Sequence, residues 1–382
     1  MIATFLTLKN WRNFLSVTTH LQERTFAVGP NASGKSNFLD ALKFLRDICR
    51  PGGGLQKAVS DRGGVSKIRC LAARKYPDIE IAIHLSESTD GSPTWKYEIG
   101  IKQAPRGYRQ PYLTYERVWH NEEQILNRPD ERDRNDELLL TQTHMEQITA
   151  NSQFREVSKF LESISYMHLI PQLIRYPHAF TGPGIPGDPF GKDFLEQVAR
   201  TQSKIRSSRL KRIEGALRIA VPQLRELAFA KDEAGYPHLE AIYEHWRPMG
   251  ARQREDQFSD GTLRLLGLLW TLLDGDSLLL LEEPELSLNS AIVSRLPGLI
   301  NRLQRQRGRQ VIISTHSADL LSDRGIGGEE VLLLTPSTEG TTVRLASSIR
   351  EIKDLLESGL SVGEAALPYT SPSDIVQLEL FR

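Results

Sequence analysis

The sequence contains very little cysteine. Only Cys49 and Cys70 occur in 382 residues, and no histidine stands near them at the spacing of a metal site. This scarcity argues against a disulfide framework and against a zinc site. It predicts two buried thiols in a reducing compartment, so we expect a cytoplasmic protein.

Long apolar runs and an excess of charge are absent as well. No stretch reaches the length of a membrane span, so no membrane partner is expected. The start, MIATFLTLKNWRNF, alternates like a first strand and lacks the basic start and apolar core of a signal peptide. Lysine plus arginine equals aspartate plus glutamate, at 48 residues each, which excludes a uniformly basic protein but allows a local basic surface.

A glycine-rich stretch near the N-terminus carries the first positive signal. Residues 29–36 read GPNASGKS and fit the Walker pattern G-x-x-x-x-G-K-[ST], with a strand pattern before it and helical periodicity after it. Backbone N–H groups of such a loop surround phosphate oxygens at a helix N-terminus. We expect Lys35 to neutralise phosphate charge and Ser36 to ligate magnesium. The predicted nucleotide contacts here are Gly29, Pro30, Asn31, Ala32, Ser33, Gly34, Lys35, Ser36 and Asn37.

The hydrophobic pattern predicts two kinds of sheet. Short strands are expected at residues 2–8, 15–19 and 25–28, and the alternating runs DIEIAIHL, TWKYEIGIK and YLTYERVW predict an antiparallel meander. SLLLLEE and QVIISTH are almost wholly apolar, as buried parallel strands are, and such strands carry chemistry at their C-terminal ends. Residues 137–164 and 190–219 have a charged helical pattern, which predicts an inserted helical lobe.

Polar residues follow both buried runs. After SLLLLEE, Glu282 can hold magnesium through water, and Glu283 can orient or deprotonate an attacking water. The alternative is a solvated strand end. His316 ends QVIISTH and would point to the same sheet edge, where it could sense a γ-phosphate. A satisfied core histidine is the alternative there.

The segment FSDGTLRLLGLLW predicts a second anion site. Ser259, Asp260 and Gly261 open an apolar helix, and together they offer a hydroxyl, backbone N–H groups and the positive end of a helix dipole. The alternative is an ordinary N-cap. If the glycine loop of one subunit and the SDG helix of another contact the same ATP, the nucleotide would hold a head-to-tail pair together.

In this order, the Walker loop, SDGT, LLLLEEPE and STHSADLL resemble the ABC-type ATPases of the RecF, OLD and chromosome-maintenance group, and within it a stand-alone AAA_21-like ATPase. The resemblance covers residues 2 to about 343. It implies an α/β fold: a P-loop ABC-type ATPase head, of mixed sheet plus antiparallel β subdomain, with an inserted helical lobe. It also implies that ATP and Mg²⁺ are the cofactors, Glu283 the catalytic base, Ser259 the signature residue acting in trans, and His316 the switch.

Further positions are implied by the same resemblance. The group's first carboxylate is usually aspartate, and the longer arm of Glu282 would shift the magnesium geometry. Gln172 in HLIPQLIR is our candidate for the glutamine loop and, with Ser36 and Glu282, for a magnesium ligand. Arg12 and Asn13 in NWRNF match a short motif that approaches the nucleotide in this group, and the alternative is a strand-to-strand turn.

Four segments are expected along the chain. Residues 1–135 would form the N-terminal part of the ATPase core with Walker A and the meander, and 136–235 the helical lobe. Residues 236–350 would form the C-terminal part with signature, Walker B and switch histidine, followed by a C-terminal helix and tail at 351–382. The long heptad arrays of coiled-coil relatives are missing from the sequence, so a tether on the scale of chromosome loops is not expected.

Three partners besides a second copy are expected. The stretch RTQSKIRSSRLKRIEGALR suggests DNA as a partner, and it is either a DNA-facing stripe or a solvated helix face. The second basic cluster, NRLQRQRGR, is expected on the outside of the core. QLELF, from Gln377 to Phe381, resembles the bacterial sliding-clamp-binding pentapeptide; a last strand or packed tail is the alternative. The sequence shows no nuclease motif, and the resemblance suggests a separately encoded Toprim-type nuclease as effector. The basic residues of the stripe are Arg200, Lys204, Arg206, Arg209, Lys211 and Arg212.

These observations predict an ATP-sandwich homodimer that uses hydrolysis to control DNA binding or an effector, in anti-phage defence or in DNA repair. A non-hydrolysing, nucleotide-dependent interaction scaffold is the alternative from another class. The ATPase subunit of a membrane transporter is a third interpretation, which would require a coupling surface for membrane domains.

Overall fold

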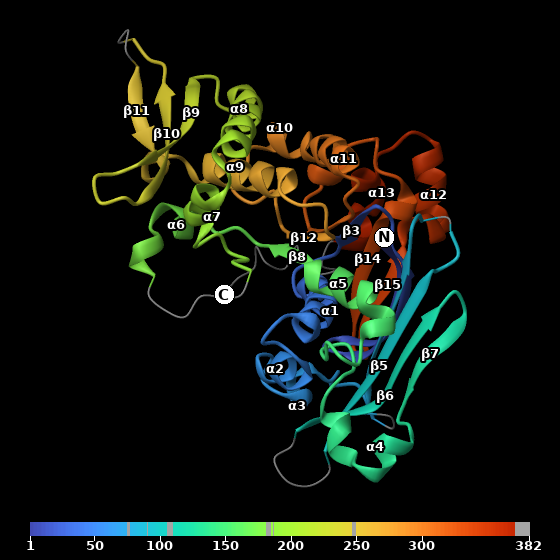
Figure 1. Cartoon of the computed structure of the whole chain (residues 1–382). Coiled ribbons are helices and arrows are strands. Elements are labelled where there is room, and N and C mark those ends of the chain that lie inside the picture. Colours follow the sequence, from blue (N-terminus) through green and yellow to red (C-terminus); the bar gives the residue numbers. More distant parts are fainter. Residues whose placement is uncertain are drawn as a thin grey trace, which may run out of the picture. The chain divides into compact units, whose positions relative to one another are not determined.

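The structure, a computed structural model, describes residues 1–74, 77–89, 91–104, 110–180, 185, 187–246 and 250–370. Unit 1 contains Met1–Ser165, Ser277–Leu280 and the chain from Gln310 onward, and unit 2 contains Tyr166–Asp276 and Leu281–Arg309 (Figure 1). Each unit therefore combines segments that are far apart in the sequence. The pentapeptide at residues 377–381 lies outside the described residues.

Alternating apolar residues build a six-stranded antiparallel sheet in unit 1. Side chains at every second position of β4 and β5 are buried, as the period-two pattern predicts. The strand order is β2, β1, β4, β5, β6, β7, so the predicted meander is confirmed and gains one strand, β7. The strands are β1 (Ile2–Trp11), β2 (Phe14–His20), β4 (Ile79–Ser86), β5 (Trp95–Gln103), β6 (Pro111–His120) and β7 (Glu123–Arg128).

The continuous apolar runs form the centre of a second six-stranded sheet, of order β15, β14, β3, β13, β12, β8. Strand β3 pairs in parallel with β13 on one side and β14 on the other, as expected for buried parallel strands. Every residue of β3 and β13 is buried, which explains why these runs show no alternation. The strands are β3 (Arg24–Val28), β8 (Ser165–Met167), β12 (Leu279–Glu282), β13 (Val311–Thr315), β14 (Val331–Ser337) and β15 (Gly340–Leu345).

A buried glutamine and one helix join the two sheets of unit 1. The Gln310 side chain accepts a hydrogen bond from the Ala3 N–H at 2.9 Å and donates to the Ala3 carbonyl oxygen at 2.6 Å. These bonds fix β1 beside the start of β13, because leaving a buried amide unpaired would cost about 1–3 kcal/mol. Helix α1 (Lys35–Cys49), which the periodicity predicted, packs Phe44 against Trp11 with ring centroids 5.1 Å apart.

Residues 137–154 differ from the helical pattern predicted for them. They form short 3-10 turns, and an α-helix begins only at Arg155. The carbonyl oxygens of Leu139 and Gln142 accept hydrogen bonds from buried Arg128, so tertiary contacts replace helical ones here. The remaining helices of unit 1 are α2 (Leu55–Ser60), α3 (Val65–Ile68), α4 (Glu131–Asn135), α5 (Arg155–Ser163), α12 (Arg350–Glu357) and α13 (Val362–Thr370).

Unit 2 contains helices and a three-stranded antiparallel sheet of order β11, β10, β9, which the sequence-based expectation of a helical lobe lacked. Helix α9 is buried on nearly all sides and forms the core of this unit. Even so, no helix of the described residues is long and apolar enough to cross a bilayer. The elements are α6 (Pro171–Arg175), α7 (Phe194–Arg200), α8 (Ser203–Ala220), α9 (Asp260–Leu273), α10 (Ser290–Val293), α11 (Leu296–Arg307), β9 (Leu224–Lys231), β10 (Pro237–Tyr243) and β11 (Ala251–Arg254).

Arg128, the last residue of β7, is the centre of a buried ion network that includes Asp133 of α4. Its guanidinium donates to Glu116 at 3.0 Å and to Asp133 at 2.7 Å, and all three side chains are at most 3% exposed. Burial raises the pKa of Glu116, while the His144 N–H and Arg128 act in the opposite direction. Glu116 and Asp133 therefore depend on Arg128 as their counterion.

We predict that Arg128→Met lowers the free energy of unfolding by about 3–5 kcal/mol, because it leaves two buried carboxylates without a counterion. Urea unfolding followed by tryptophan fluorescence measures the change. The control is Lys57→Met, whose partner Asp61 lies 2.9 Å away in an exposed pair that we expect to contribute at most about 1 kcal/mol. Equal losses in the two variants would contradict the network's role.

Candidate nucleotide site

The glycine loop connects the buried strand β3 to helix α1. A Cβ atom on Gly29 would lie 2.5 Å from the Leu334 carbonyl oxygen, and one on Gly34 would lie 2.1 Å from Asn13 Nδ2. Gly34 also has a φ of 93°, which side chains disfavour. The first N–H groups of α1 have no partner within the helix, so the loop presents them to an anion.

Lys35 lies folded against its own loop. Its Nζ donates to the carbonyl oxygens of Gly29 at 3.0 Å and Pro30 at 3.1 Å, and the residue is buried. A phosphate oxygen would be a stronger acceptor for this ammonium than either carbonyl. Ser36 follows in the first turn of α1 and is exposed, as are Asn31 and Ala32 at the tip of the loop. Ser33 is fully buried and Asn37 is half-buried.

Asn13 supports the loop from the turn between β1 and β2. Its Nδ2 donates to the Ser33 carbonyl oxygen at 3.0 Å and to Thr341 Oγ1 at 2.7 Å. Its Oδ1 accepts a hydrogen bond from Asn37 at 2.8 Å. The asparagine therefore holds the second half of the loop and the start of α1. No pattern in the sequence indicates that Thr341 takes part.

Arg12, the neighbouring candidate, is engaged elsewhere. It forms an ion pair with Asp40 of α1 at 3.2 Å, and Arg62 pairs with the same carboxylate at 2.8 Å. Burial raises the pKa of Asp40, but Arg62, Lys43 and Arg12 together outweigh burial and hold that pKa below its ordinary value. The structure thus brings Asn13 to the loop and places Arg12 on the side of α1.

His316 lies at the same sheet edge as the loop. Strands β13 and β3 are parallel, with Thr315 paired to Val28, so His316 and Gly29 are the next residues on neighbouring strands. The histidine is exposed. His316 therefore lies beside the start of the glycine loop in unit 1.

The acidic pair lies in unit 2. The Glu282 carboxylate accepts a hydrogen bond from the Tyr166 hydroxyl, and the Glu282 carbonyl oxygen lies 3.2 Å from His168 Nδ1. Glu283 has a φ of 44°, an uncommon backbone conformation for a residue with a side chain, which functional sites often stabilise. Sequence reasoning missed Tyr166 and His168, because nothing in the sequence indicates pairing across more than 110 residues.

The SDG segment begins helix α9, as predicted. Ser259 is the N-cap, and its Oγ accepts a hydrogen bond from the Thr262 N–H at 3.2 Å. A Cβ on Gly261 would lie 2.8 Å from the Ser287 carbonyl oxygen, so glycine is needed for close approach. Gln172 donates to Asp260 Oδ2 at 2.9 Å, which places this candidate metal ligand at the signature segment.

Arg264 lies one turn further along α9. Burial lowers the pKa of its guanidinium, while Glu285, Asp260 and Glu283 act in the opposite direction. This buried arginine is thus shared among three carboxylates of unit 2.

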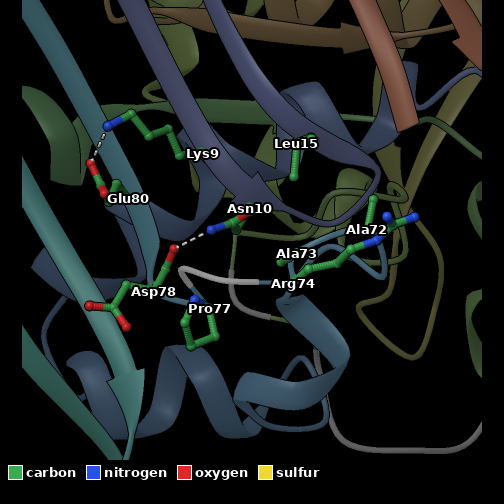
Figure 2. A pocket seen from close by; sticks show the side chains of 9 residues that line it. All are labelled: Lys9, Asn10, Leu15, Ala72, Ala73, Arg74, Pro77, Asp78 and Glu80. Carbon is green, nitrogen blue, oxygen red and sulfur yellow. Dashed lines mark hydrogen bonds and ion pairs between the residues drawn. The ribbon is translucent and has the colours of Figure 1, made fainter. Parts of the chain in front are cut away.

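A separate hollow lies in unit 1 beside strands β1 and β4. Figure 2 shows Lys9 paired with Glu80 at 2.9 Å, and Asn10 donating to the Asp78 carbonyl oxygen at 2.7 Å. The hollow has a volume of about 490 Å³. Charges of both signs line it, so it shows no preference for a phosphate, unlike the glycine loop. The lining residues are Lys9, Asn10, Leu15, Ala72, Ala73, Arg74, Pro77, Asp78 and Glu80.

The family model described as AAA domain, putative AbiEii toxin, Type IV TA system matches residues 25–323. This chain belongs to the AAA_21 family. The matched range of the AAA_21 protein contains the glycine loop, the SDG segment, Glu282, Glu283 and His316. A comparison with curated proteins found no match.

Solved structures show the same fold for this AAA_21 protein. The crystal structure of the SmcHead bound to the C-winged helix domain of ScpA is similar at 15% identity and a TM-score of 0.52, covering 90% of this chain and 98% of the other. An Smc head domain with an extended coiled coil, bound to the C-terminal domain of ScpA from Pyrococcus furiosus, has 13% identity and a TM-score of 0.52, with 92% and 99% covered. The predicted fold class and the resemblance to the ABC-type ATPase group are confirmed.

The residues present fit ATP with Mg²⁺. Mg²⁺ prefers oxygen ligands and usually combines one or two protein groups with phosphates and water. Ser36 in unit 1 and Glu282 in unit 2 each carry an oxygen of this kind, and the loop of unit 1 carries N–H groups and the Lys35 ammonium for phosphates. Among the described residues no group of three or more His, Cys, Asp or Glu could hold a metal ion.

We predict that Gly34→Ala weakens ATP binding by more than about tenfold, because the new methyl group displaces Asn13 and strains the loop. Titration with a fluorescent ATP analogue measures the affinity. Gly52→Ala is the control, because Gly52 has a similar φ of 73° but a Cβ there would meet nothing within 4 Å. Equal affinities in the two variants would contradict the importance of this contact.

Proposed function

We propose that this protein is an ATPase and that two copies of it enclose ATP between them. Hydrolysis of the ATP would control how the dimer binds DNA or an effector. The glycine loop carries the proposal, since its N–H groups, the backbone of Gly34 and the Lys35 ammonium are the groups that bind a triphosphate in such loops. Membership of an AAA family supports nucleotide-dependent ATPase activity.

The roles of the other residues follow from their chemistry. Glu283 would take a proton from the attacking water, and His316 would hydrogen-bond the γ-phosphate. Ser36 and Glu282 would hold Mg²⁺, which neutralises phosphate charge when bound. Ser259 and the N–H groups at the start of α9 would contact the nucleotide of a second copy. The glycine loop contacts a triphosphate from one side, and the N-terminus of α9 from the second copy would contact the other side.

We predict that Glu283→Gln slows phosphate release by about 10²- to 10⁴-fold while ATP affinity is retained, because the base acts on water. Light scattering should then show ATP-bound dimers that persist. Lys35→Ala is the comparison, since it should lose ATP binding and dimers together. A Glu283→Gln protein that hydrolyses ATP at the normal rate would refute the assignment of the base.

A basic surface on unit 2 supports DNA as a partner. Arg206 and Arg209 of the predicted stripe face inward, because Arg206 donates to the Ala199 carbonyl oxygen at 2.8 Å and Arg209 pairs with Asp274 at 2.7 Å. Arg212 instead donates to Gln306 of α11 at 2.9 Å, so a side chain of α8 contacts α11. The exposed cations of this surface include Lys204, Lys211 and Arg218 on α8 and Arg302 and Arg305 on α11.

We predict that Lys204→Glu combined with Lys211→Glu weakens binding to a labelled duplex at least tenfold, because two phosphate contacts are lost. The slope of log affinity against log salt should fall by about 2, which fluorescence anisotropy at several salt concentrations measures. The same charge change at exposed Arg350 and Lys353 of α12 is the control. If both double variants weaken binding equally, this surface is not the DNA site.

A separately encoded effector protein is proposed to carry out the cellular effect of ATP binding and hydrolysis. The family description names a putative toxin of a Type IV TA system, which supports a role in defence more than in repair. The two similar SMC heads are each bound to a domain of ScpA, which supports the idea that a head of this fold acts with a partner protein. Sliding-clamp binding through residues 377–381 and a Toprim-type nuclease as the effector remain part of the proposal.

A further inference from the structure

The acidic residue of the SDG segment is held by helix α6. Arg175 Nη2 donates to Asp260 Oδ1 at 2.6 Å and also to the Phe258 carbonyl oxygen at 2.7 Å. Gln172 donates to the other carboxylate oxygen, Oδ2, at 2.9 Å. Both oxygens of Asp260 and the backbone just before Ser259 are therefore bonded to one short helix.

The contacts from Arg175 and Gln172 reduce an unfavourable charge interaction at the start of α9. The N-terminus of a helix attracts anions, but a carboxylate in the first turn would repel a phosphate arriving at the same end. Arg175 places a cation against this carboxylate at 2.6 Å, and the Arg175 side chain is 16% exposed and the Asp260 side chain 36%, so the pair is partly shielded from solvent. Arg264 does not replace it, because that buried arginine is also attracted to Glu283 and Glu285.

We infer that Arg175 and Gln172 are positioning residues that neutralise Asp260 and turn it aside, so that Ser259 and the helix N-terminus can receive the triphosphate of a second copy. The inference rests on the proposed function, since it requires a phosphate at α9. It also assigns Gln172 to the signature segment instead of to magnesium. Aspartate in this position and arginine on α6 thus form one interdependent pair.

The test is a double-mutant cycle on ATP-induced dimerisation of the full chain, in a Glu283→Gln background that slows hydrolysis. Arg175→Ala should weaken dimerisation at least about tenfold, because it leaves Asp260 without its counterion, while ATP affinity of the monomer is unchanged. Asp260→Asn added to Arg175→Ala should recover most of the loss, since it removes the charge that repels the phosphate. Arg175→Lys should recover part of it.

Ionic strength provides a second readout that a purely structural role would not change. The defect of Arg175→Ala should shrink between about 0.05 M and 0.5 M salt, because like-charge repulsion is screened over a few ångströms at high salt. Dimerisation of Arg175→Ala that is normal, or not recovered by Asp260→Asn, would overturn the inference. Failure of the Glu283→Gln protein itself to dimerise with ATP would instead overturn the proposed function.

Discussion

The proposed nucleotide site depends on one constraint, which is that backbone N–H groups must reach a phosphate without interference from side chains. The buried strand β3 delivers the chain to the start of α1, and glycine is required at both ends of the loop because neighbouring atoms lie within 2.5 Å of any added Cβ. Asn13 and Thr341 then tie the loop to segments more than 300 residues apart in the sequence. The antiparallel sheet, β15 and α1 all contribute to keeping this short loop in place.

Several acidic residues near the proposed chemistry have a specific partner. Glu282 accepts from Tyr166, Asp260 from Arg175 and Gln172, and Arg264 lies among the carboxylates that follow β12. These contacts orient groups that would otherwise repel a nucleotide. Hydrogen bonds within unit 2 therefore hold the side chains of the signature segment and of the acidic segment in place.

Much of the fold could be predicted, because its signals are local. Alternation identified β4, β5 and β6, continuous apolar runs identified β12 and β13, and the glycine pattern identified the loop. Residues 137–154 could not be predicted, because buried Arg128 and Glu116 take the hydrogen bonds that a helix would make. The roles of Tyr166, Arg175 and Thr341 could not be predicted either, because each depends on a contact between distant segments.

The central claim is that each ATP is shared by the glycine loop of one copy and the α9 N-terminus of another. Mixing Lys35→Ala protein with Ser259→Arg protein tests this most directly. Each variant alone should be inactive, but a mixed dimer rebuilds one intact site, so an equal mixture should recover about a quarter of normal phosphate release if subunits exchange at random. Activity of the mixture that stays at the average of the two separate variants would contradict a shared site.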